Sequence, residues 1–501
     1  MRRSGILMPI FSLPSPYGIG TLSEEAYRFV DFLQEAGQSL WQILPLGPTG
    51  YGDSPYQSFS TFAGNPYFID PDDLVKRGYI TKADCKKYDA TVNPEYIEYD
   101  KVYETRFALL RKAYENSNIA QDADFGRFVK EQKFWLEDYA LFMAVKGKMD
   151  NRGYNEWPDD IRLRKPQALK KYREELADEI LFYEFQQYMF HVQWTALKKY
   201  ANEKGIQIVG DIPIYVAFDS ADSWSNPKLF QFDRDGKPIG VAGCPPDAFS
   251  ATGQLWGNPL YDWPYHEKTG FEWWLKRIEY CFTLYDVVRI DHFRGFDEYY
   301  AIPYGNPTAE FGKWEKGPGY ALFDAMKKKL GNKQVIAEDL GFLTPSVIKL
   351  VKKTGLPGMK ILQFAFDSRE DSDYLPHNYT ANSVVYTGTH DNDTTLGWFA
   401  SIAPADRAFA KRYLDIHSRK RVEMHFVRAA LGSVSDTCII PMQDYLGLGG
   451  EARINVPSTL GTNWKWRMKA SALQEEQAKP LAAEIYSLTK MYARLAKKQT
   501  S

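Results

Sequence analysis

The chain has 501 residues, and its 62 lysines and arginines nearly balance its 64 aspartates and glutamates, for a formal net charge of −2. A near-neutral chain without a basic block lacks the positive surface that nucleic acids require, so we expect no nucleic-acid partner. No apolar stretch approaches the roughly 20 residues of a membrane span, and no long apolar segment follows the basic residues at the start. We therefore expect no membrane partner and a cytoplasmic location.

The four cysteines lie far apart in the sequence and form no CxxC pair (Cys85, Cys244, Cys281 and Cys438). This spacing predicts reduced thiols and argues against a zinc site or a disulfide framework. A phosphate-binding GxxxxGK[ST] loop is also missing, since Gly312 and Lys313 are followed by Trp314.

The first 68 residues predict a strand, a helix and a second strand. An apolar run at 5–9 is followed by a helix that begins after Ser23 and ends near Gly37, with an apolar stripe at Ala26, Phe29, Val30 and Leu33. A second strand-like run covers 41–46. Strand, helix and strand in this order are typical of a parallel sheet.

Residues 69–200 interrupt this rhythm, since they are rich in charged residues and helical in period. We interpret them as a mainly helical insertion between a first barrel segment, 1–68, and the remainder of a catalytic barrel, 201–501. Six further strand-like runs follow the insertion, at 206–211, 285–291, 335–338, 359–366, 384–389 and 438–442. Together the eight runs predict an α/β fold, a (β/α)8 TIM barrel with helical and loop insertions, and residues 471–498 predict a closing helix pair.

Three acids, Asp291, Glu338 and Asp391, lie at or just after the ends of the runs at 285–291, 335–338 and 384–389. Active sites of such barrels lie at the carboxyl ends of the strands, and side chains alternate between the two faces of a strand. We therefore expect the three acids to converge with Asp211 and Arg289 at one mouth of the barrel.

A pair of carboxylates flanking one bond is what glycoside chemistry requires. Asp291 is expected to stay ionised, because the nearby Arg289 cation lowers a carboxyl pKa, and this suits a nucleophile. Glu338 ends a more apolar strand, where burial raises the pKa and favours a general acid. Taken alone, Asp291 could equally form a structural ion pair and Glu338 a helix cap.

Several longer strings carry a resemblance to one family. They are Leu-Pro-Leu-Gly-Pro-Thr-Gly-Tyr-Gly-Asp-Ser-Pro-Tyr at 44–56, Gly-Asp-Ile-Pro-Ile-Tyr-Val at 210–216, Pro-Pro-Asp-Ala-Phe-Ser-Ala-Thr-Gly-Gln-Leu-Trp-Gly-Asn-Pro at 245–259 and Gly-Thr-Asn-Trp at 461–464. With Arg-x-Asp, Glu-Asp and His-Asp after successive strands, the chain resembles the 4-α-glucanotransferases of the amylomaltase or disproportionating-enzyme type, glycoside hydrolase family 77 of the α-amylase clan. The resemblance runs from about residue 4 to residue 498.

The resemblance implies roles for particular residues. Asp291 matches the family's nucleophile, Glu338 its general acid and base, and Asp391 the third acid that holds sugar hydroxyls. The matching substrate-binding positions are Ser54, Tyr56, Asp211, Phe249, Gln254, Trp256, Arg289, His292, His390 and Asn463. Residues 243–262 are expected to form a loop that covers the active site on the acceptor side.

The implied activity is transfer of an α-1,4-glucan segment from one malto-oligosaccharide to the 4-hydroxyl of another glucan or of glucose, through a covalent glycosyl-enzyme intermediate with retained configuration. Starch- or glycogen-derived glucans would be substrates, and the chemistry needs neither a metal nor an organic cofactor. Three alternatives stay open: a hydrolase with the same acids, a catalytically silent glucan-binding protein, and a phosphate-binding barrel enzyme. The sequence leaves the oligomeric state undecided.

Overall fold

The computed structural model describes residues 2–50, 52–246, 250–341 and 343–495, and its centre is an eight-stranded parallel sheet. The order of neighbouring strands is β10-β11-β12-β1-β2-β3-β6-β9. The first and last strands of this order, β10 and β9, are also neighbours, which closes the barrel. The amide of Ala337 in β9 donates to the carbonyl of Pro357, one residue before β10, over 3.0 Å. The barrel strands are β1 (Arg3–Leu7), β2 (Leu40–Gln42), β3 (Gln207–Ile212), β6 (Val287–Ile290), β9 (Val335–Ala337), β10 (Gly358–Ile361), β11 (Ser383–Tyr386) and β12 (Thr437–Pro441).

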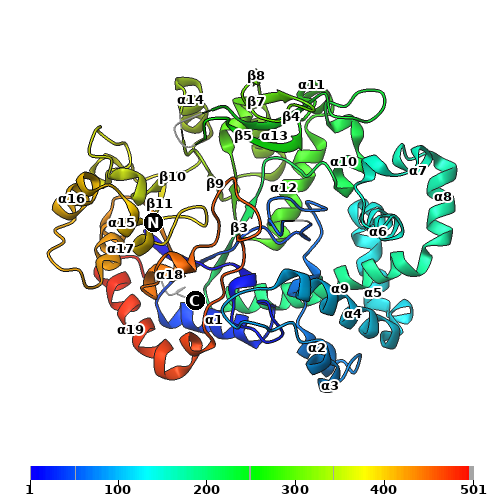
Figure 1. The fold of residues 1–501 in the computed structure, drawn as a ribbon, viewed down its shortest axis with the longest axis horizontal. Coiled ribbons are helices and arrows are strands. Elements are labelled where there is room, and N and C mark those ends of the chain that lie inside the picture. The colour runs from blue at the N-terminus through cyan, green and yellow to red at the C-terminus, as the bar shows by residue number, and fades with distance from the viewer. Residues whose placement is uncertain (1, 51, 247–249, 342, 496–501) are drawn as a thin grey trace.

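Each of the eight strand-like runs of the sequence overlaps one of these strands, and the predicted (β/α)8 barrel is confirmed. Helices lie between the strands and surround the barrel (Figure 1). Those that follow strands of the barrel are α1 (Glu24–Glu35), α9 (Ala177–Glu203), α12 (Glu272–Leu284), α13 (Tyr320–Leu330), α14 (Pro345–Thr354), α15 (Thr395–Ser401), α16 (Pro404–Tyr413), α17 (Val422–Gly432), α18 (Met442–Tyr445) and α19 (Glu475–Met491).

A group of helices between β2 and β3 lies to one side of the barrel, at the right of Figure 1. Its last member, α9, joins this group to the barrel, because it packs on α6 as well as on α1 and β3. The other members are α2 (Pro71–Lys76), α3 (Lys82–Lys87), α4 (Tyr99–Ser117), α5 (Ala123–Glu131), α6 (Lys133–Lys148), α7 (Asp159–Arg162) and α8 (Pro166–Glu175).

A second, antiparallel sheet of four strands lies beyond the carboxyl ends of β3 and β6, with strand order β5-β4-β7-β8. Its strands are β4 (Gly240–Cys244), β5 (Gln254–Pro259), β7 (Glu298–Pro303) and β8 (Lys313–Lys316), and α10 (Ala221–Ser225) and α11 (Trp263–Lys268) flank the β4–β5 pair in sequence. Residues 243–262, expected as a loop, therefore include the end of β4 and the whole of β5. The glycines and prolines of this segment disfavour a strand, but pairing with a neighbouring strand outweighs that preference.

The C-terminal region differs from the predicted helix pair. The described part of 471–498 contains one α-helix, α19, after a short 3-10 turn at Ala470–Leu473. The helix packs along α1, so the first and last barrel helices lie side by side (Figure 1).

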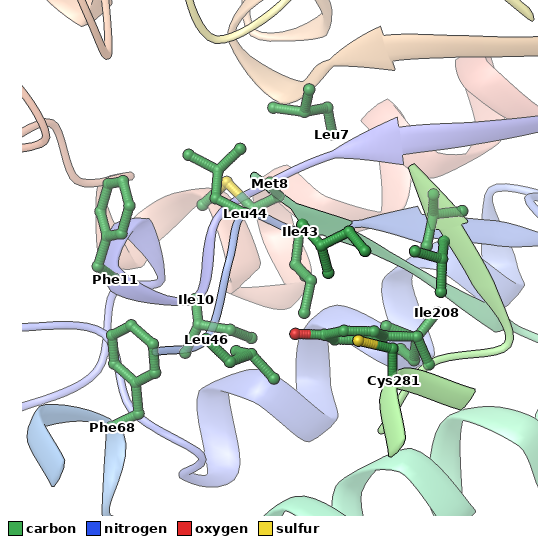
Figure 2. Packing of buried hydrophobic residues seen from close by; sticks show 14 of the residues in the cluster. Leu7, Met8, Ile10, Phe11, Ile43, Leu44, Leu46, Phe68, Ile208 and Cys281 are labelled. Carbon is green, nitrogen blue, oxygen red and sulfur yellow. The ribbon is translucent and has the colours of Figure 1, made fainter. Parts of the chain in front are cut away.

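Buried apolar side chains fill the space between the strands and the helices around them. Figure 2 shows Leu7 and Met8 near β1, Ile43 and Leu44 after β2, and Cys281 of α12 in this core. Packing is tight at Gly210, where an added Cβ would lie 2.2 Å from a ring carbon of Tyr285. Only a residue without a side chain fits there, which fixes one side of the strand that carries Asp211. Among the described residues, no helix is long and apolar enough to cross a membrane.

Candidate active site

The charged residues predicted to converge lie at the carboxyl ends of neighbouring barrel strands. Asp211 in β3 is paired in register with Arg289 in β6, so their side chains project from adjacent strands to the same face. Asp291 follows the last residue of β6, and Glu338 follows the last residue of β9, which is the next strand in the sheet. Three adjacent parallel strands thus deliver four charged groups to one mouth of the barrel.

Arg289 connects two of these acids. Its guanidinium is 3% exposed, and Nη1 donates to both carboxylate oxygens of Asp211 over 2.8 and 2.6 Å. Nη2 lies 3.1 Å from Oδ1 of Asp291. Since a guanidinium holds its donors in a rigid plane, this double contact fixes the position of the Asp291 carboxylate.

The electrostatics of Asp291 differ from the prediction that Arg289 would keep its pKa low. Burial raises the pKa of Asp291 to about 7, Arg289 opposes this rise, and the nearby charge of Asp211 adds to it. The physical reason is burial, which outweighs the attraction of Arg289, and the charge of this guanidinium is also shared with Asp211. The side chain of Asp291 keeps 28% of its surface exposed, so a bound ligand would desolvate it further.

Glu338 is held by backbone groups. Its Oε2 accepts the amide of His292 over 2.6 Å, and its Oε1 accepts the amide of Leu340 over 3.2 Å. His292 has a left-handed backbone with φ of 49°, a strained conformation that aims this amide at Glu338. Burial and, next, the charge of Asp291 raise the pKa of Glu338 to about 8, as the sequence predicted in direction. The proton on the pair therefore favours Glu338, and Asp291 is the group that ionises first.

Asp391 reaches the mouth of the barrel from the loop after β11. Its Oδ1 accepts the side-chain amide of Asn455 over 2.6 Å, and its backbone carbonyl accepts Nη2 of Arg453 over 2.8 Å. The neighbouring His390 has Nε2 3.4 Å from the same carboxylate oxygen, and burial lowers the pKa of His390, which favours the neutral ring. Asn455 and Arg453 were missed by the sequence analysis, because nothing in a single chain indicates which polar residue meets Asp391.

Aromatic rings line the mouth beside these charges. The ring of Tyr56 stacks on His390 with centroids 5.2 Å apart and planes at 16°, and its hydroxyl donates to Oδ2 of Asp211 over 2.8 Å. The ring centroid of Trp464 lies 5.9 Å from that of Tyr56 and 6.0 Å from that of His390. Ser54 lies in the same loop as Tyr56 and accepts the Tyr56 amide over 3.3 Å. Rings combined with carboxylates suit a flat, hydroxylated ligand.

The β4–β5 hairpin brings Trp256 next to His292, the residue that follows Asp291. Its indole meets His292 edge to face with centroids 4.8 Å apart, and its N–H donates to Oε1 of Gln254 over 3.1 Å. Burial lowers the pKa of His292 to about 4, so the ring under Trp256 is neutral. Phe249, also predicted here, lies outside the described residues.

Asn463 uses its side chain within its own loop. Its Oδ1 accepts the amide of Val456 over 2.9 Å, and its Nδ2 donates to the carbonyl of Thr459 over 2.8 Å. These contacts brace the segment that carries Asn455 and Trp464, and a contact of Asn463 with a substrate stays a prediction. In the part of the chain that the structure describes, no group of three or more His, Cys, Asp or Glu side chains could hold a metal ion.

Comparison with known proteins is consistent across sequence and structure. A family profile described as 4-alpha-glucanotransferase matches residues 8–473. The 4-alpha-glucanotransferase of Clostridium butyricum is 51% identical over 97% of this chain and 100% of its own length. That of Thermus thermophilus is 47% identical over 96% of this chain and 98% of its own length. Among solved structures, the amylomaltase of Streptococcus agalactiae in complex with acarbose superposes with a TM-score of 0.95 at 43% identity, covering 99% of this chain and 100% of that one.

Proposed function

The chain belongs to the family of 4-alpha-glucanotransferases and is an enzyme of the amylomaltase type, and from this premise we propose how its own residues carry out the transfer. The observation that carries the proposal is the pairing of Asp291, fixed by Arg289, with Glu338, whose pKa is the higher of the two. One ionised and one protonated carboxyl group at neighbouring strand ends are the two partners that a retaining glycosidase mechanism requires.

In the first step the protonated Glu338 gives its proton to the glycosidic oxygen while the carboxylate of Asp291 attacks C1 of the donor sugar. The bond between C1 and that oxygen breaks, the leaving glucan departs with a new 4-hydroxyl, and the retained segment becomes an ester of Asp291. The charge of Asp291, which after burial contributes most to the raised pKa of Glu338, is thereby removed, so this pKa falls and Glu338 becomes a suitable base for the next step.

In the second step the 4-hydroxyl of an acceptor gives its proton to Glu338 and attacks C1 of the ester. The ester bond breaks, Asp291 regains its charge, and a new α-1,4 bond forms with the original configuration. Asp391, held by Asn455 and Arg453, would bind the hydroxyls of the reacting sugar and favour its positively charged transition state.

The substrates that fit this proposal are malto-oligosaccharides and glucans derived from starch or glycogen, with glucose as the smallest acceptor. Tyr56, His390 and Trp464 would contact the donor, and Trp256 would cover the acceptor side. We place the reaction in the cytoplasm, a proposal supported by Cys85, Cys281 and Cys438, which are buried thiols that form no disulfide.

The proposal is tested by incubating the purified protein with maltotriose alone and separating the products over time. Transfer predicts released glucose together with a ladder of maltodextrins longer than the substrate. Glucose and maltose without longer products would instead identify a hydrolase, and an unchanged substrate would favour a glucan-binding protein. Asp291→Ala serves as the control, since it keeps the binding surface and removes the nucleophile.

A further inference from the structure

A hollow of about 280 Å³ lies outside the catalytic residues, between α6 of the outer helical group and α10, α11 and α12 of the barrel region. It is separate from the barrel mouth, since none of the three acids lines it. Its volume is near the lower end of the range of ligand pockets, about 300–1,000 Å³, so it suits a small or narrow ligand.

Aromatic rings form the floor and two walls of this hollow. Phe62 is buried at 6% exposure, and the rings of Phe134 and Trp273 each stand at 87° to it, with centroids 5.5 and 6.4 Å away. Phe134 keeps 41% of its surface exposed although it belongs to an otherwise well-buried helix. Two rings standing on a third leave apolar faces and edges available to a ligand.

Three polar groups around these rings are not used within the protein. In the described residues, the indole N–H of Trp273, the hydroxyl of Tyr265 and the carboxylate of Glu272 make no hydrogen bond, although all three line the hollow. The tips of Trp273 and Tyr265 are not buried, so both donors are open to a ligand. Two donors and one acceptor beside apolar faces match a pyranose, whose C–H bonds cover its faces and whose hydroxyls lie at its edge.

The charges of the hollow select against other ligands. In the part of the chain that the structure describes, Glu272 forms no ion pair and disfavours phosphates and other anions, whereas Asp138, which also lines the hollow, is paired with Arg164 over 2.7 Å. Lys276, the cation among the described residues that line the hollow, has its Nζ 4.5 Å from the ring centroid of Phe134 and is engaged by that ring. A neutral, hydroxylated ligand remains the best match.

Two residues that line the hollow also line a cavity that borders residues of the barrel mouth. Ser60 and Phe62 also line a second, smaller cavity of about 40 Å³, whose other walls include Tyr56 and Asp211. We propose that the hollow formed by Phe134, Trp273 and Tyr265 is a second α-1,4-glucan site, which holds one part of a long chain while another part is processed. This inference rests on the proposed function. A second binding site raises the effective concentration of a polymer at the catalytic site. It does not change the binding of a substrate that is too short to span both sites.

The test compares a polymer with a short substrate in two variants. Trp273→Phe keeps an aromatic ring and removes the N–H, and Phe134→Ala removes a ring that is 41% exposed. Binding is measured by retardation in native gels containing amylopectin, and turnover is measured with maltotriose. We expect the affinity for amylopectin to fall roughly two- to tenfold in Trp273→Phe, the range of one hydrogen bond, and more in Phe134→Ala, with maltotriose turnover unchanged in both.

Two controls separate the possible outcomes. Phe311→Ala removes a ring that is 77% exposed on the connection between β7 and β8, and it should change neither measurement. Asp291→Ala should abolish turnover and keep retardation, so failure of the proposed mechanism is distinguishable from failure of the second site. Unchanged retardation in both hollow variants would overturn the proposal. So would a loss of self-association in Phe134→Ala, seen by light scattering, because the exposed ring would then belong to an interface between copies.

Discussion

The side-chain amide of Asn455 donates to Oδ1 of Asp391 over 2.6 Å, and this contact links the loop after α18 to the third acid of the site. Arg453 strengthens the link, since its Nε donates to the carbonyl of Asn455 over 2.7 Å and its Nη2 to the carbonyl of Asp391. The loop thus fixes both the backbone and the carboxylate of Asp391, and Asn455 acts as a positioning residue.

Replacing Asn455 should therefore impair catalysis through Asp391. Asn455→Leu removes one hydrogen bond to a charged group, a loss of about 1.5–3 kcal/mol, and should lower kcat/KM about ten- to a hundredfold. Asn455→Asp should lower it further, because two carboxylates would then face each other. The rates are measured with maltotriose, and thermal unfolding is followed in parallel.

Asn332→Asp, at an exposed position before β9, is the matched control. A variant that unfolds earlier but turns over normally would show Asn455 to be merely structural.

The pH dependence should report the carboxyl pair. With pKa values raised to about 7 for Asp291 and about 8 for Glu338, kcat/KM should fall below the first value as the nucleophile gains a proton. It should fall above the second value as the acid loses its proton. Glu338→Gln should reduce turnover by about 10²–10⁴-fold and remove the alkaline limb. The exposed Glu370→Gln should leave the profile as it is, and an alkaline limb that survives in Glu338→Gln would assign it to another group.

The sequence sufficed for the barrel and for the convergence of the acids, because parallel strands place all their carboxyl ends at one mouth. It did not yield the second sheet, where Gly243 and Gly257 made β4 and β5 resemble a loop and the deciding pairing is with the distant β7. The Asp291 pKa was also mispredicted. Burial of Asp291 is the largest cause of the rise, and the charge of Asp211, which the register of β3 on β6 brings close, adds to it. One sequence reveals neither the burial nor the register.

Asp211 therefore offers a direct test of the shared arginine. Asp211→Asn keeps an oxygen for the hydroxyl of Tyr56 and for Arg289, but removes a negative charge that raises the pKa of Asp291. The pKa of Asp291 should fall, so the acid limb of the kcat/KM profile should move to lower pH while kcat decreases. The exposed Asp371→Asn is the control. An acid limb that stays in place, or moves to higher pH, would show that Asp211 does not tune the nucleophile.

Trp256 should determine how the glycosyl ester on Asp291 partitions between hydrolysis by water and transfer to a sugar acceptor. Its indole covers His292, the residue next to Asp291, and its N–H is fixed by Gln254. Trp256→Ala removes this cover and the surface on which an acceptor would stack, so water should reach the ester more often. We expect the ratio of new reducing ends to transferred glucosyl units to rise severalfold, with cleavage of the donor less affected. Reducing ends and chain-length distributions are measured in the same reaction with maltotriose.

Phe311→Ala, which removes an exposed ring from the same antiparallel sheet region, should keep the original ratio. If Trp256→Ala keeps it as well, the β4–β5 hairpin has no part in excluding water from the ester.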